Sequence, residues 1–227
     1  MRLDDKPLIA ILLVGFIPSA SVIFGIEIID NELYSQIFFV SCKIWIFLVP
    51  TVWYLRVEKK SISKNLPTKE GIFTGLITGI IMSLIILVTW FLFSETLDVD
   101  GMVDILQSKG LDSFNLYFLG MFYWIFINSL LEEYVFRWFI TIKSSEFFGS
   151  NTIGIIFSAA MFTLHHAIAL HLFGFIWWQI LIACFGLLSA AAIWSWLYIR
   201  FRSIWICWLS HAICDVVVFA IGYTILF

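Results

Sequence analysis

Residues 71–94 read GIFTGLITGIIMSLIILVTWFLFS, a run without a single charged side chain. A helix needs about 20 mainly apolar residues to cross the hydrocarbon core of a bilayer. Runs of this kind recur along the whole chain, and the candidate spans lie near residues 7–29, 36–55, 71–94, 114–142, 152–173, 175–198 and 204–226. The sequence therefore predicts an all-α fold, a polytopic membrane helical bundle of about seven transmembrane helices.

The composition indicates that the solvent of this chain is largely lipid. Hydrophobic residues make up 62% of its 227 residues and charged residues 13%, whereas soluble domains carry about 25% charged residues. We expect one integral membrane domain over residues 1–227, with the lipid bilayer as a partner. The net charge of −3 is small and gives no reason to expect a nucleic acid partner. The four cysteines lie inside apolar stretches without paired spacing, so neither a disulfide nor a zinc framework is expected; they are Cys42, Cys184, Cys207 and Cys214.

The first apolar run is compatible with either a membrane span or a cleaved signal peptide. Small residues at 19–21 loosely resemble a cleavage site, but the apolar run continues to Ile29. We therefore interpret residues 7–29 as a span.

Basic residues are concentrated in alternate loops. One set of loops carries Arg2, Lys6, Arg56, Lys59, Lys60, Lys64, Lys69, Lys143, Arg200 and Arg202. The other set carries one basic residue, Lys109, among several acidic ones. Cytoplasmic loops are enriched in Lys and Arg. The sequence therefore predicts a multi-pass cell-membrane protein with a cytoplasmic N-terminus and, after seven spans, a C-terminus outside.

Ionisable side chains also occur inside three of the spans. They are Glu132, Glu133 and Arg137 in the fourth span, His165 and His166 in the fifth, and His211 and Asp215 in the seventh. Such residues are costly in a bilayer and usually face a protein interior or a wet cavity. The isolated Lys43 in the second span has no partner at helical spacing and receives no predicted role.

Helical geometry makes the three clusters coherent. Glu133 and Arg137 are four residues apart and can pair, as can His211 and Asp215, whereas Glu132 lies about 100° around the helix from Glu133 and stays available for chemistry. At a rise of about 1.5 Å per residue, Glu132 lies roughly 16 Å from the cytoplasmic end of its span, and His211, Asp215 and His166 lie roughly 10, 17 and 21 Å from theirs. We therefore expect a single polar site in the cytoplasmic half to middle of the bilayer.

These clusters resemble the three ordered motifs of the CPBP family, which includes CAAX-processing endopeptidases and bacteriocin-processing or immunity proteins. The motif residues here are Glu132-Glu133-x-x-x-Arg137, Phe162-x-x-x-His166 and His211-x-x-x-Asp215. The resemblance covers about residues 114–226, which would form the catalytic core. One position departs from the pattern, because Trp138 stands where Gly is common.

The resemblance implies an intramembrane glutamic-type endopeptidase, which would act on a peptide or membrane-protein substrate. No cofactor is expected, and because the chain shows no spacing typical of three zinc ligands, we expect no bound metal. Glu132 and His166 would activate a water molecule, and His211 and Asp215 would support the oxyanion. Glu133, Arg137 and Phe162 would orient the site. The doubled His165-His166 leaves the register open, although Phe162 four residues earlier favours His166.

Three other functions remain open at this stage. A metalloprotease could use Glu132, His166 and His211 as zinc ligands, although the chain has no HExxH motif. A non-catalytic membrane scaffold or immunity-type protein could retain the fold, and a proton-coupled transporter could use the same acid–histidine chain as a relay.

Overall fold

The computed structural model describes residues 6–61, 66–108 and 113–227, and within these ranges every regular element is helical. Seven helical runs are long and apolar enough to cross a membrane. They are Lys6–Ile28, Glu32–Val57, Lys69–Thr96, Phe114–Phe148, Asn151–Leu172, Trp177–Phe201 and Ile204–Leu226. The predicted number and approximate positions of the spans are confirmed.

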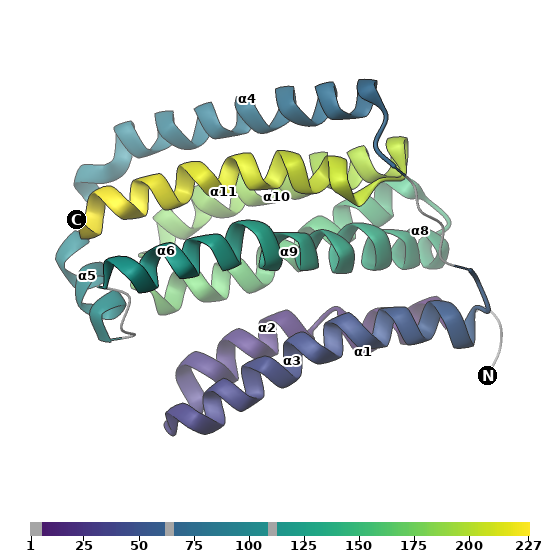
Figure 1. Cartoon of the computed structure of the whole chain (residues 1–227), viewed down its shortest axis with the longest axis horizontal. Helices are drawn as coiled ribbons and strands as arrows, with labels where there is room; N and C mark the ends of the chain where they lie inside the picture. Colours follow the sequence, from purple (N-terminus) through teal and green to yellow (C-terminus); the bar gives the residue numbers. More distant parts are fainter. Residues whose placement is uncertain (1–5, 62–65, 109–112) are drawn as a thin grey trace.

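Several spans are built from more than one helical segment (Figure 1). The first three comprise α1 (Lys6–Val14), α2 (Ile17–Val22), η2 (Ile23–Ile28), α3 (Glu32–Val52), η3 (Trp53–Val57), α4 (Lys69–Phe93) and η4 (Ser94–Thr96). The fourth comprises α6 (Phe114–Phe122), η5 (Tyr123–Asn128), α7 (Ser129–Glu132), η6 (Glu133–Thr141) and α8 (Ile142–Phe148). The last three are α9 (Asn151–Leu172), α10 (Trp177–Phe201) and α11 (Ile204–Leu226). A short helix, α5 (Val99–Ser108), lies between the third and fourth spans and was not predicted.

The ends of the spans follow from local side-chain chemistry. The side chains of Asn31, Thr68 and Ser150 each accept a hydrogen bond from a backbone N–H in the first turn of the helix that follows, which satisfies donors that have no partner inside the helix. Gly174, at a φ of 84°, closes the short connection between α9 and α10. These two helices pack against each other along their length, because so short a connection makes them antiparallel neighbours.

Helix α4 packs closely against α11 because glycines line the contact. A Cβ atom added to Gly75 would lie 2.9 Å from the Ile206 carbonyl oxygen, and one added to Gly79 would lie 2.9 Å from the Ser210 carbonyl oxygen. Small residues four apart allow the backbones of membrane helices to approach in this way. The approach fixes the position of α11, which carries the third polar cluster.

The first two spans form a separate layer beneath the other five (Figure 1). Polar contacts outside the predicted site join the C-terminal end of the second span, and the residues just after it, to the fourth span. The Thr51 Oγ1 and Tyr134 Oη atoms lie 2.7 Å apart, and Glu58 forms ion pairs with Lys60 and Lys143. Partial burial by itself raises the pKa of Glu58, but hydrogen bonds from Lys143 and Lys60 outweigh this effect, and the net pKa is lowered.

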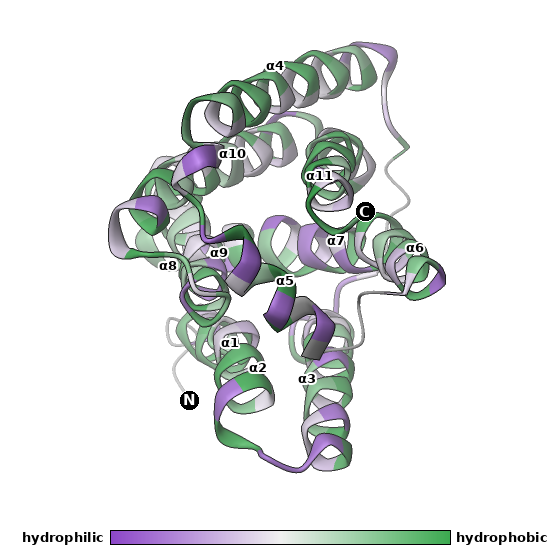
Figure 2. Ribbon diagram, turned by 90° about the vertical axis from the view of Figure 1, so that its left-hand side faces the viewer, coloured by the Kyte–Doolittle hydropathy of each residue, from purple (hydrophilic) through white to green (hydrophobic). Residues whose placement is uncertain are grey.

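The outer faces of the helices are apolar, whereas the hydrophilic stretch at α7 lies among the other helices (Figure 2). Phe73, Leu84 and Phe91 on α4 are each more than half exposed. Such side chains suit a surface that faces lipid. The polar residues of the fourth span are therefore enclosed by a mostly hydrophobic exterior.

Candidate active site

Helices α7, η6, α9 and α11 bring the three predicted polar clusters together in the interior. Glu132 ends α7, and Glu133 begins η6. The Glu132 Oε1 atom lies 3.7 Å from His165 Nε2, and its Oε2 atom lies 3.9 Å from His211 Nε2. Residues far apart in the sequence thus surround one carboxylate, as the matching depths of the clusters predicted.

Glu133 is fully buried and pairs with Arg137 and His211. Its Oε2 atom accepts a hydrogen bond from Arg137 Nε at 3.0 Å, and its Oε1 atom accepts one from His211 Nδ1 at 2.9 Å. The i,i+4 pairing of Glu133 with Arg137 was predicted, whereas the bond to His211 on another helix was not. A buried carboxylate needs such partners to compensate for lost hydration. Glu133 therefore links the first and third motifs.

Arg137 has no exposed surface, and aromatic rings surround its guanidinium. The guanidinium carbon lies 4.7 Å from the ring centre of Phe162 and 5.3 Å from that of Trp194. Within the described residues, the two terminal nitrogens of Arg137 make no hydrogen bond. The faces of the aromatic rings partly replace that interaction, because their electron-rich surfaces attract a cation.

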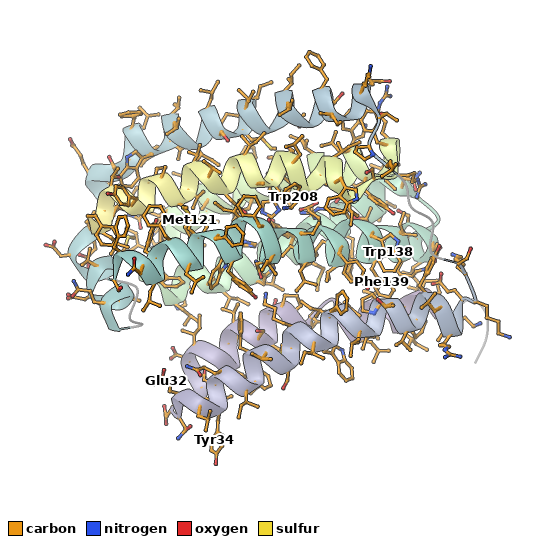
Figure 3. The ribbon with its side chains drawn as sticks, viewed as in Figure 1. Glu32, Tyr34, Met121, Trp138, Phe139 and Trp208 are labelled. Atoms are coloured by element: carbon orange, nitrogen blue, oxygen red, sulfur yellow. The ribbon has the colours of Figure 1, made fainter. Side chains whose placement is uncertain are left out.

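The fourth span is unusual in containing two π-helical segments around Glu132. In η6, the Phe136 carbonyl oxygen accepts hydrogen bonds from Thr141 Oγ1 and Ser158 Oγ, each at 2.8 Å. In η5, the Ile125 carbonyl oxygen accepts a hydrogen bond of 3.2 Å from the indole nitrogen of Trp208. Trp208 lies on α11 and points toward the fourth span (Figure 3). Short π-helical segments are often found at functional sites. Apolar periodicity gave no indication of them.

The two adjacent histidines both lie near Glu132 but have different environments. The Nδ1 atom of His166 lies 3.0 Å from the Phe162 carbonyl oxygen. Because a carbonyl can only accept, this contact requires the proton on Nδ1 and leaves Nε2 of a neutral ring as an acceptor. His165 stacks on the Phe136 ring with the centroids 5.4 Å apart. His165 Nε2 lies 3.7 Å from Glu132 Oε1, and potential ligand atoms of both histidines and Glu132 lie within 4.8 Å of one another.

His211 is held by contacts on its edges and its face. Its ring stacks on Trp194 with the centroids 4.1 Å apart and the planes inclined by 18°. Its Nε2 atom lies 3.5 Å from Asp215 Oδ1, and its Nδ1 atom faces Glu133. Both ring nitrogens can therefore interact with carboxylates, and they can donate to both only in the protonated form.

Phe162 and Trp138 were singled out in the sequence, and they lie in different places. Phe162 is fully buried and contacts the rings of His166 and His211, so it packs inside the cluster. Trp138 lies at the end of the molecule near α8 (Figure 3). It stacks on Tyr134 and lines a pocket of about 220 Å³ with Tyr54 and other residues. Its bulk is therefore accommodated beside the end of α3.

Two residues of the polar cluster were missed in the sequence. Lys43 Nζ donates to Asn128 Oδ1 at 2.5 Å, and Asn128 Nδ2 donates to Glu132 Oε1 at 2.8 Å. The i,i+4 spacing of Asn128 and Glu132 was a visible signal for the second bond. The first bond joins residues far apart in the chain, and no local pattern indicates it.

One group of side chains has the composition of a metal site. Potential ligand atoms of Glu132, His165 and His166 lie within 4.8 Å of one another. Carboxylate and imidazole donors suit Zn²⁺, and the set differs from the zinc ligands considered in the sequence because it contains His165 in place of His211. The expectation that the protein works without a metal stays a prediction.

Comparison with known proteins identifies the family of the C-terminal half. The model of a family described as type II CAAX prenyl endopeptidase Rce1-like matches residues 114–217. Residues 114–217 belong to the CPBP family. No curated protein and no solved structure matches the chain. The CPBP match ends close to residue 226, where the predicted catalytic core ends, and includes all three motifs. At family level it supports a CAAX-type intramembrane protease.

Proposed function

We propose that this protein is an intramembrane glutamic endopeptidase in which Glu132 and His166 activate a water molecule. The observation that carries the proposal is the enclosed cluster in which Glu132 lies beside the imidazoles of α9 and α11. A carboxylate and an imidazole that share a water can assist its attack on a peptide carbonyl. The family match over the same residues supports this chemistry.

The reaction proceeds by proton transfer through Glu132. The water oxygen bonds to the peptide carbonyl carbon, and Glu132 takes the released proton while His166 Nε2 orients the water. Glu132 then gives the proton to the peptide nitrogen, and the C–N bond breaks to give a carboxylate and an amine. Proton transfer of this kind contributes roughly a hundredfold or more to the rate.

The third motif stabilises the negative charge that develops on the carbonyl oxygen during attack. His211 Nε2 lies 3.9 Å from Glu132, so a carbonyl carbon attacked beside Glu132 would place its oxygen within reach of this imidazole. Glu133 orients the ring through Nδ1. Fixed donors aimed at an oxyanion often contribute a large part of the rate enhancement. The substrate is a peptide or a segment of a membrane protein.

Glu132→Gln tests the proposal because Gln keeps the shape of the side chain but cannot accept a proton from water. We expect cleavage to fall roughly a hundredfold or more. The purified wild-type protein and the variant are reconstituted in vesicles with membrane proteins, and mass spectrometry records the peptide termini that only the wild type generates. Near-normal cleavage by Glu132→Gln would contradict the proposal, and the absence of any new terminus with the wild type would favour a non-catalytic scaffold.

A chelator arm of the same experiment separates the glutamic mechanism from a zinc hydrolase built on Glu132, His165 and His166. The glutamic mechanism predicts unchanged cleavage after exposure to a zinc chelator. Loss of cleavage on chelation, recovery on return of the metal and one zinc ion bound per protein would assign the group to a metal centre.

A further inference from the structure

Lys43 lies in α3, outside the residues that match the family, yet it reaches the polar interior. An ionised lysine near the centre of a membrane span is costly and usually has a polar partner. The Nζ atom of Lys43 donates to Asn128 Oδ1 at 2.5 Å and lies 5.0 Å from the Phe39 ring centre. Asn128 is buried, with 5% of its surface exposed.

The chemistry of lysine determines which way the Asn128 amide points. An ammonium group has three donors and no acceptor, so it can pair only with the oxygen of the amide. With Oδ1 directed at Lys43, the NH₂ group of Asn128 faces Glu132 and donates to Oε1 at 2.8 Å. The ionised Glu132 carboxylate can only accept, so it requires the same orientation of the amide from the other end. Lys43 therefore holds the oxygen end of an amide whose NH₂ end serves Glu132.

The chain also distinguishes the two oxygens of Glu132. Oε1 receives the amide hydrogen from Asn128, and Oε2 is directed toward His211 Nε2 at 3.9 Å. Without the Asn128 donor, the carboxylate would be free to rotate about its terminal torsion. A misplacement of about 1 Å at a reacting group can reduce the rate about a hundredfold.

We propose that Lys43 is a positioning residue that, through Asn128, holds the Glu132 carboxylate in its reactive orientation. The inference rests on the proposed function of Glu132. It gives α3, which the family match does not include, an indirect part in the reaction through Asn128. Its test must distinguish control of orientation from a simple tie between α3 and the fourth span.

The decisive comparison is between Lys43→Arg and Lys43→Gln. Arginine has donors only and so preserves the direction of the amide, whereas glutamine can tie the helices but can also accept from Asn128. The reporter is a quenched fluorescent peptide copied from a cleavage site that the wild type generates and Glu132→Gln does not. We expect Lys43→Gln to lower kcat about tenfold with KM unchanged, and Lys43→Arg to recover most of kcat.

Thr51→Val provides the matched control, because Thr51 joins the same two spans by a hydrogen bond to Tyr134 that does not involve Glu132. This variant should lower the melting temperature but leave kcat unchanged. Asn128→Asp provides an independent variant, since the new carboxylate still accepts from Lys43 but cannot donate to Glu132. It should lower kcat at least as much as Lys43→Gln.

Wild-type kcat in Lys43→Gln or in Asn128→Asp would overturn the positioning role, and so would equal losses of kcat in Lys43→Gln and Thr51→Val. If Glu132→Gln still cleaves the reporter, the proposed function itself fails. If Glu132→Gln is inactive while Lys43→Gln is fully active, only the positioning role fails.

Discussion

At the scale of single residues, the site depends on pairs of neighbouring side chains that point in different directions. Glu132 and Glu133 are adjacent, but Glu133 is fully buried against Arg137 and His211, whereas Glu132 lies beside the histidines of α9. The pair thus divides into a carboxylate held by Arg137 and His211 and a carboxylate to which we assign, as a proposal, the activation of water. This division follows from the angle of about 100° between successive helical residues.

Asp215 offers the sharpest residue-scale test of the third motif. An ionised carboxylate cannot donate to an oxyanion, so Asp215 is either a neutral donor or an acceptor that orients His211. Its Oδ1 atom lies 3.5 Å from His211 Nε2, and this contact favours the orienting role. We expect Asp215→Asn to lower kcat roughly tenfold or more and to shift the pH optimum. Full activity with an unchanged pH profile, measured with the reporter peptide, would instead support the neutral donor.

Contacts within one helix could be predicted from the sequence, whereas contacts between different helices could not. Helical spacing within one span predicted Glu133 with Arg137 and placed Glu132 apart from them. The bond from Glu133 to His211 and the bond from Lys43 to Asn128 join different helices. These contacts depend on how the spans rotate and pack, which periodicity within one helix does not specify. Lys43 therefore seemed isolated in the sequence although it belongs to the cluster.

At the scale of helices, the close contact between α4 and α11 determines where the third motif lies. Gly79 meets the backbone of Ser210, the residue before His211. The number of spans and the pairing of α9 with α10 could be predicted from apolar length and loop length. The π-helical segments and the register of α4 on α11 could not be predicted, because the apolar residues of these spans also fit an ordinary α-helix packed in another register.

Gly79→Ala tests this contact. The added Cβ atom would lie 2.9 Å from the Ser210 carbonyl oxygen and 3.0 Å from a methyl group of Ile213, so α4 must move away from α11. Overpacking of this kind typically costs about 1–3 kcal/mol. We expect a lower melting temperature in detergent and a lower kcat, since His211 would shift. Gly186→Ala on α10, which meets nothing within 4 Å, is the control and should preserve both quantities. Equal behaviour of the two variants would refute the packing argument.

At the scale of the whole molecule, the distribution of basic residues distinguishes one end of the helical bundle from the other. The first helix begins at the end of the molecule where α8 ends, and α11 ends at the opposite end (Figure 1). An odd number of spans requires this arrangement. The basic residues described at the α8 end include Lys60, Lys143 and Arg202, which line one pocket. From the positive-inside rule we expect this end to face the cytoplasm.

The orientation can be measured with single cysteines at Ser61 and Ser113, which are both exposed and lie in loops after the second span and before the fourth. The background variant lacks all four native cysteines, which are Cys42, Cys184, Cys207 and Cys214. In intact cells, an impermeant thiol reagent should label Ser113→Cys but not Ser61→Cys, because only the loops poor in basic residues face outside. Permeabilised cells should label both variants and so show that each thiol is reactive. Labelling of Ser61→Cys in intact cells would reverse the orientation, and substrates would then reach Glu132 from the outer face.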